Sequence, residues 1–197
     1  MLVVKPNQLG IKKAIAALKK GGVIVYPTDT AYALGGIFNS PKVIKIVLKI
    51  KKRADPKFTL VAANLKQVEK IFKLNILEKK LAKKYWPGPL SIVVSSRFSV
   101  RVPKNKIARL LALKTGKPLI ATSANLSGAK TPYDSQKIIK AFKSKKTPAS
   151  SAKKADSARQ EPDLILDFGR LPKKPVSTII RVKNKKIEII RQGGIKI

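Results

Sequence analysis

The chain has 197 residues, 44% of them hydrophobic, which predicts one domain, residues 1–197, with a core large enough to need no crosslinks. Cysteine and histidine are absent, so disulfides, thiolate nucleophiles, histidine-containing triads and histidine-based zinc sites are excluded. Lys and Arg number 44 against 10 Asp and Glu, and the formal charge of +34 favours polyanionic partners such as nucleotides or RNA. Because the lysines are spread along the whole chain, a general lysine enrichment explains the charge equally well.

The sequence contains no sign of a membrane segment. No apolar run approaches the roughly 20 residues that cross a bilayer. Residues 1–6, MLVVKP, lack the sustained apolar stretch and cleavage signal of a secretory peptide. We therefore expect a cytoplasmic protein, which the absence of cysteine also fits.

The first half of the chain is predicted to alternate between helices and strands. An apolar stripe favours a helix ending at Gly21-Gly22, and the β-rich run after it ends at Pro27. The expected order is a helix at 9–20, a strand at 23–26, a helix at 41–50, a strand at 58–63, and helices at 65–72 and 76–85.

The second half is richer in strands. The expected order is strands at 90–94 and 100–102, a helix at 107–114, a strand at 118–121, a helix at 135–143, and strands at 164–168, 177–182 and 187–190. Residues 144–162 are rich in Ser, Ala, Lys and Pro, and we predict a mobile loop there. The alternation predicts an α/β (α+β) fold with a mixed sheet and flanking helices.

Polar clusters follow several of the apolar runs. They are Thr28-Asp29-Thr30, Lys51-Lys52-Arg53, Thr122-Ser123-Ala124-Asn125 and Ser177-Thr178, with Arg101 and Arg191 beside strands. Guanidinium and ammonium groups with nearby hydroxyls and amides are suited to binding phosphate or carboxylate. Neither a P-loop nor a Gly-x-Gly-x-x-Gly motif is present. Each cluster taken alone is more typical of a cap, a turn or a solvated helix end than of a site.

Taken in order, the clusters resemble the YrdC-like threonylcarbamoyl-AMP synthases. The resemblance rests on seven blocks: YPTDTAYALG (26–35), KKR (51–53), WPGPL (86–90), VRVP (100–103), TSANLSG (122–128), STII (177–180) and IRQG (190–193). It runs from about residue 21 to 193 and implies a twisted mixed sheet with flanking helices around a large basic cavity. It also suggests a short form without the extra C-terminal domain of longer relatives. Ala33 and Ala54 depart from the glycine and proline common in the family, and Ala62 stands where some relatives carry histidine.

The resemblance also implies roles for individual residues. The expected L-threonine contacts are Thr30, Arg101, Ser123 and Ser177. The expected ATP contacts are Lys51, Arg53, Lys57, Asn125 and Arg191, with Lys51 and Arg53 facing phosphate as the catalytic pair.

The implied reaction joins L-threonine, bicarbonate or CO₂, and ATP into threonylcarbamoyl-AMP and pyrophosphate, for threonylcarbamoyladenosine modification of tRNA. Its nucleophile is an N-carboxylate that is already ionised, so it needs no histidine as a base. We expect Mg²⁺ to arrive with ATP, since no carboxylate cluster marks a metal site of the protein. The product would pass to a threonylcarbamoyl transferase complex. Two alternatives remain at this stage: a non-catalytic YrdC-like protein that binds tRNA or other RNA, and a carbamoyl-transfer domain like those of hydrogenase maturation factors.

Overall fold

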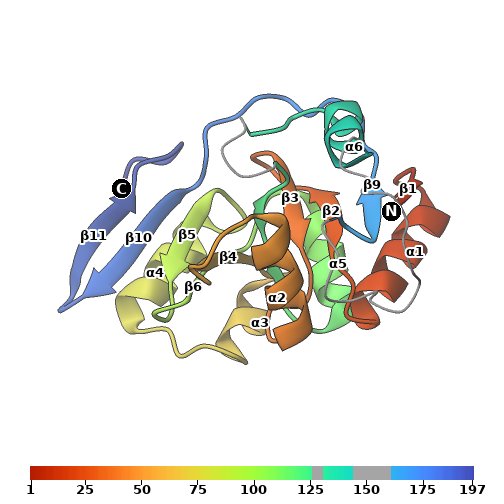
Figure 1. Ribbon diagram of the computed structural model, residues 1–197. Coiled ribbons are helices and arrows are strands. Elements are labelled where there is room, and N and C mark those ends of the chain that lie inside the picture. The colour runs from red at the N-terminus through yellow and green to blue at the C-terminus, as the bar shows by residue number, and fades with distance from the viewer. Residues whose placement is uncertain (126–130, 144–160) are drawn as a thin grey trace.

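The computed structural model of the chain describes residues 1–125, 131–143 and 161–197. Its strands form two mixed sheets (Figure 1). The first has the order β1-β9-β2-β3-β8 and contains β1 (Leu2–Val4), β9 (Leu164–Leu166), β2 (Ile24–Pro27), β3 (Tyr32–Gly35) and β8 (Thr122–Ser123). Central β2 runs parallel to β9 and antiparallel to β3.

The second sheet has the order β11-β10-β5-β6-β4-β7. It contains β11 (Lys186–Arg191), β10 (Thr178–Lys183), β5 (Leu90–Val93), β6 (Phe98–Arg101), β4 (Phe58–Val61) and β7 (Leu119–Ile120). The β10–β11 hairpin lies at the end of the molecule far from the N-terminus, and every residue of the edge strand β11 is exposed (Figure 1).

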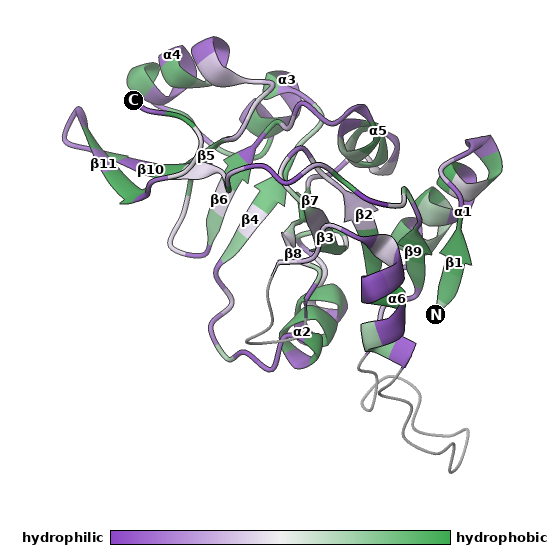
Figure 2. Ribbon diagram, turned by 90° about the horizontal axis from the view of Figure 1, so that it is seen from above, coloured by the Kyte–Doolittle hydropathy of each residue, from purple (hydrophilic) through white to green (hydrophobic). Residues whose placement is uncertain are grey.

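Six helices accompany the sheets in the described part of the chain. They are α1 (Gln8–Lys19), α2 (Pro41–Ile50), α3 (Leu65–Glu69), α4 (Ile76–Tyr85), α5 (Lys106–Thr115) and α6 (Ser135–Lys143). The first five each begin at an Asn or Ser whose side chain accepts a backbone N–H of the first turn. The strands between them are largely apolar, while α3, α4 and α6 carry hydrophilic stretches (Figure 2). None of these helices is long and apolar enough to cross a membrane.

The two sheets meet where β3 approaches β7. A Cβ added to Gly35 would lie 1.9 Å from the carbonyl oxygen of Ile120, so only glycine permits this approach. The same carbonyl accepts the Tyr26 hydroxyl at 2.8 Å, and the Ile120 N–H donates to the Gly36 carbonyl at 2.8 Å. Only Ala121 separates β7, in the second sheet, from β8, in the first. This junction brings residues of both sheets to one place.

The mixed α/β class and the order of most elements confirm the sequence prediction. The predicted strand at 118–121 is instead two short strands in different sheets, because the chain crosses the junction at Ala121. The helix at 65–72 ends at Glu69. Strands β1 and β3 were not predicted. Of the loop predicted at 144–162, residues 144–160 lie outside the described residues.

Candidate functional site

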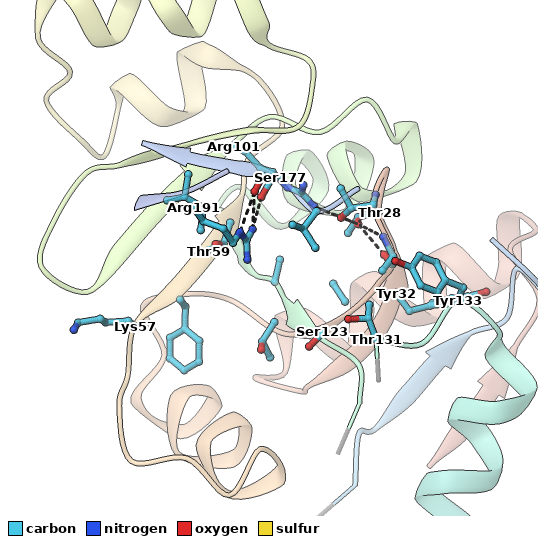
Figure 3. Close-up of a pocket in the computed structure, with 18 of the residues that line it drawn as sticks. Thr28, Tyr32, Lys57, Thr59, Arg101, Ser123, Thr131, Tyr133, Ser177 and Arg191 are labelled. Atoms are coloured by element: carbon cyan, nitrogen blue, oxygen red, sulfur yellow. Dashed lines mark hydrogen bonds between the residues drawn. The ribbon is translucent and has the colours of Figure 1, made fainter. Parts of the chain in front are cut away.

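A cavity of about 340 Å³ opens at the junction of the two sheets (Figure 3). Both sheets and the segments that connect them supply its lining. The polar lining residues are Thr28, Thr30, Tyr32, Arg53, Lys57, Thr59, Arg101, Thr122, Ser123, Thr131, Tyr133, Ser177 and Arg191. The described lining contains four cationic side chains and no carboxylate, so the cavity is electrostatically suited to an anion.

The turn after β2 forms one wall. The Thr28 hydroxyl donates to the Ala31 carbonyl at 2.7 Å and accepts the Thr30 N–H at 3.2 Å, which closes the turn on itself. Arg101, the last residue of β6, crosses from the second sheet to meet this turn. Its Nη2 donates to the hydroxyls of Thr28 and Thr30 at 3.2 and 3.0 Å.

Arg101 is 4% exposed, yet its guanidinium retains unused donors. Nη2 lies 3.4 Å from Oδ1 of Asp29, which supplies the compensating charge. Nε and Nη1 are buried and meet no hydrogen-bond partner among the described residues. An unpaired buried donor costs roughly 1–3 kcal/mol, so a shift of the guanidinium that lets a ligand oxygen accept from these atoms would be favourable.

The opposite wall is built around Ser177, which directly precedes β10. Arg191 of β11 donates from Nη2 to the Ser177 hydroxyl at 2.9 Å, and from Nε and Nη2 to the Ser177 carbonyl at 3.1 and 2.8 Å. Partial desolvation and, secondly, the charge of Arg101 lower the pKa of Arg191. The fully buried Ser91 of β5 donates to the same Ser177 hydroxyl at 3.1 Å.

Lys51 does not line the cavity but lies behind it. This residue follows the last turn of α2, is 8% exposed, and directs its ammonium at the segment after β8. Nζ donates to the carbonyls of Ser123 and Asn125 at 3.0 and 2.8 Å and to Oδ1 of Asn125 at 2.6 Å. Burial and, secondly, the charge of Arg53 lower the pKa of Lys51 to about 8. The three contacts anchor the segment that carries Ser123.

Arg53 and Lys57 line the cavity from the segment that joins α2 to β4. The guanidinium of Arg53 donates to the carbonyls of Asp55 and Lys57 and lies 5.2 Å from the centre of the Phe58 ring. The side chain of Lys57 is 71% exposed and lies 3.7 Å from an oxygen of Asp55. Both cations are therefore at the solvent-facing side of the cavity.

Asn125 borders a neighbouring cavity of about 690 Å³ beside α6. Thr131 and Tyr133 line both cavities, so the two adjoin there. The Ser123 hydroxyl donates to Oδ1 of Asn125 at 2.6 Å, which couples Asn125 to the first cavity.

Seven of the nine residues expected from the sequence line one cavity: Thr30, Arg53, Lys57, Arg101, Ser123, Ser177 and Arg191. Lys51 and Asn125 adjoin it through their contacts with Ser123. Sequence reasoning missed Ser91 and gave Thr28 no role of its own. Thr28 lay in a quoted motif, whereas Ser91 looks like any serine within an apolar strand. In the described residues no group of three or more Asp and Glu side chains could hold a metal ion.

The chain is similar to known proteins over most of its length. A family model named Sua5/YciO/YrdC and described as "Telomere recombination" matches residues 16–193. The threonylcarbamoyl-AMP synthase of Psychromonas ingrahamii is 34% identical over 161 residues, covering 73% of this chain and 83% of that protein.

Two solved structures share the fold. P. abyssi Sua5 complexed with L-threonine matches with a TM-score of 0.80 and 25% identity, over 98% of this chain and 56% of that one. The chain thus spans little more than half the length of that Sua5. Escherichia coli YciO matches with a TM-score of 0.77 and 26% identity, over 98% of this chain and 93% of YciO.

Proposed function

Because the chain belongs to the Sua5/YciO/YrdC family, we propose that it is a threonylcarbamoyl-AMP synthase. Its substrates are L-threonine, bicarbonate or CO₂, and ATP, and its products are threonylcarbamoyl-AMP and pyrophosphate. The single observation that carries the proposal is the cavity lining: four cations, several hydroxyls and, among the described residues, no carboxylate.

That lining fits the chemistry of the reaction. The N-carboxylate of threonine is already ionised, so its attack on the α-phosphate of ATP needs no base. The barrier instead comes from repulsion between this anion and the triphosphate, and from the charge that develops on pyrophosphate. Fixed cations lower both contributions, and one such contact contributes on the order of 3 kcal/mol, or roughly a hundredfold in rate.

The residues divide between the two substrates in this proposal. Arg101, Thr30 and Ser177 bind threonine, and Ser123 adds a hydroxyl on the same side. Arg53, Lys57 and Arg191 meet ATP, while Lys51 supports the phosphate side by holding the Ser123–Asn125 segment. Asn125 completes that segment.

Mg²⁺ accompanies ATP in this proposal, held by the phosphates rather than by a protein carboxylate cluster, and it would neutralise charge on the phosphates. The product is a reactive mixed anhydride. Its natural consumer is a threonylcarbamoyl transferase complex that modifies tRNA.

Product detection tests the proposal directly. The protein is incubated with ATP, L-threonine and bicarbonate, and the adenylate is identified by mass spectrometry. Arg53→Ala should lower the rate of threonine-dependent pyrophosphate release about a hundredfold. The matched control is Arg97→Ala, because Arg97 also lies over a phenylalanine ring, 5.7 Å from that of Phe98, but outside the cavity lining. No adenylate from the wild-type protein would refute the proposal.

The charge of +34 favours one second candidate, an RNA-binding protein without synthase activity. That function predicts RNA binding that weakens steeply with salt and no calorimetric response when threonine and ATP are added. The same adenylate assay therefore separates the two functions.

A further inference from the structure

Ser91 is a fully buried serine in contact with the cavity wall. It lies on β5, between β10 and β6, and is 0% exposed. Its hydroxyl donates to the Ser177 hydroxyl at 3.1 Å across 86 residues of chain. Ser177 itself is 4% exposed and lines the cavity. The buried hydroxyl of Ser91 is therefore connected to the cavity by its hydrogen bond to the Ser177 hydroxyl.

The hydrogen bonds around Ser177 fix the direction of its proton. A hydroxyl can accept two hydrogen bonds and donate one. Arg191 has no acceptor, so the 2.9 Å contact from its Nη2 must use one acceptor position of the Ser177 oxygen. The donation from Ser91 uses the other. The proton of Ser177 is then the group left for a ligand in the cavity.

We propose that Ser91 is a positioning residue that makes Ser177 a hydrogen-bond donor toward the amino-acid substrate. This inference rests on the proposed synthase function. The ligand atom opposite Ser177 is an acceptor, a carboxylate oxygen of threonine or of its N-carboxylated form, and not the ammonium group. Were Ser177 instead to donate to Ser91, it would present only a lone pair to the cavity and would favour a donor. Ser91 therefore sets which end of the amino acid faces this wall.

A double-mutant cycle on L-threonine affinity, measured by calorimetry, tests the inference. Ser177→Ala removes a donor to a charged acceptor and should weaken threonine binding roughly 10- to 150-fold. Ser91→Ala leaves the Ser177 hydroxyl free to rotate and should weaken binding by a smaller factor, roughly 2- to 10-fold. In the double variant, Ser91→Ala should have no further effect, because the hydroxyl that it orients is gone.

The matched control is Ser99→Ala on the neighbouring strand β6. Ser99 is also a buried strand serine, and its hydroxyl pairs at 3.0 Å with that of Thr59, a lining residue to which the proposed function assigns no contact with threonine. Its replacement should lower the thermal midpoint about as much as Ser91→Ala does, with threonine affinity unchanged. This control separates an orienting role from a general loss of stability.

Each outcome bears on a different claim. Factors for Ser91→Ala and Ser177→Ala that simply multiply in the double variant would overturn the positioning role, as would a Ser91→Ala protein that binds threonine like the wild type. A folded wild-type protein that binds no threonine would instead refute the proposed function itself.

Discussion

Arg101→Lys is the substitution most informative about how the site holds a carboxylate. It keeps one positive charge beside Asp29, which avoids the penalty of leaving a buried carboxylate unpaired. It removes the planar set of donors. In the structure those donors reach the hydroxyls of Thr28 and Thr30, and Nε and Nη1 have no partner among the described residues.

The expected loss follows from this hydrogen-bond count. A lysine ammonium is a compact point charge and cannot serve the turn, Asp29 and the ligand from one position. At least one charge-assisted hydrogen bond to the substrate carboxylate should be lost, and such a bond contributes about 1.5–3 kcal/mol. At 1.36 kcal/mol per factor of ten, threonine affinity should fall roughly 10- to 150-fold. ATP affinity should change little because the net charge of the cavity is unchanged.

Calorimetric titration with L-threonine and, separately, with ATP measures both expectations. Arg97→Lys makes the same chemical change outside the cavity lining and should leave both affinities as in the wild type. A folded Arg101→Lys protein whose threonine affinity lies within about twofold of the wild type would show that the guanidinium does not hold the carboxylate.

Two further predictions concern Lys51 and the sheet junction. The pKa of Lys51 is lowered to about 8, so above that pH its amine loses a proton and can no longer donate all three hydrogen bonds to Ser123 and Asn125. We therefore expect kcat/KM to fall above about pH 8. The Lys51→Arg variant stays charged, so its kcat/KM should fall less above pH 8. Titrations of the substrates affect both proteins alike and cancel in the ratio of the wild-type and variant pH profiles. Identical profiles would contradict the role of Lys51. Gly35→Ala places a Cβ 1.9 Å from the backbone oxygen of Ile120 and should cost about 1–3 kcal/mol of unfolding free energy, or about 2–12 °C in thermal midpoint. In the control Gly194→Ala, the added Cβ comes no closer than 3.3 Å to the Pro175 side chain and 4.0 Å to the Val176 carbonyl oxygen, so stability should change little.

The sequence predicted the fold class and named most of the expected residues that line the cavity, because both depend on local patterns. Apolar periodicity and the N-caps of the helices identify the elements, and polar clusters at strand ends identify the cavity walls. The sequence did not predict β3, because only Tyr32 of its four residues is favoured in strands, while Ala33 and Gly35 are not. This strand forms because its neighbours pair with it and because glycine permits the close approach to Ile120.

Two residues at the site make contacts between distant parts of the chain that the sequence does not show. Lys51 was expected to face phosphate, but its position just after α2 directs its ammonium at carbonyls more than 70 residues away. Ser91 carries no local signal, since its partner is brought to it only by the parallel pairing of β5 with β10. Contacts of this kind depend on which distant segments pack together, and local sequence patterns do not show that.

The cluster of cations in the cavity has a consequence for the lifetime of the folded protein. The positive charge of Arg101 helps to lower the pKa of Arg191, and among the described residues Asp29 pairs with Arg101 while no carboxylate pairs with Arg191. This repulsion opposes folding, and an anion bound between the two guanidinium groups would relieve it. Substrate therefore stabilises the native state by mass action. A cell rich in threonine and ATP would keep more of this protein intact than a starved one, so its abundance would follow the supply of what it consumes.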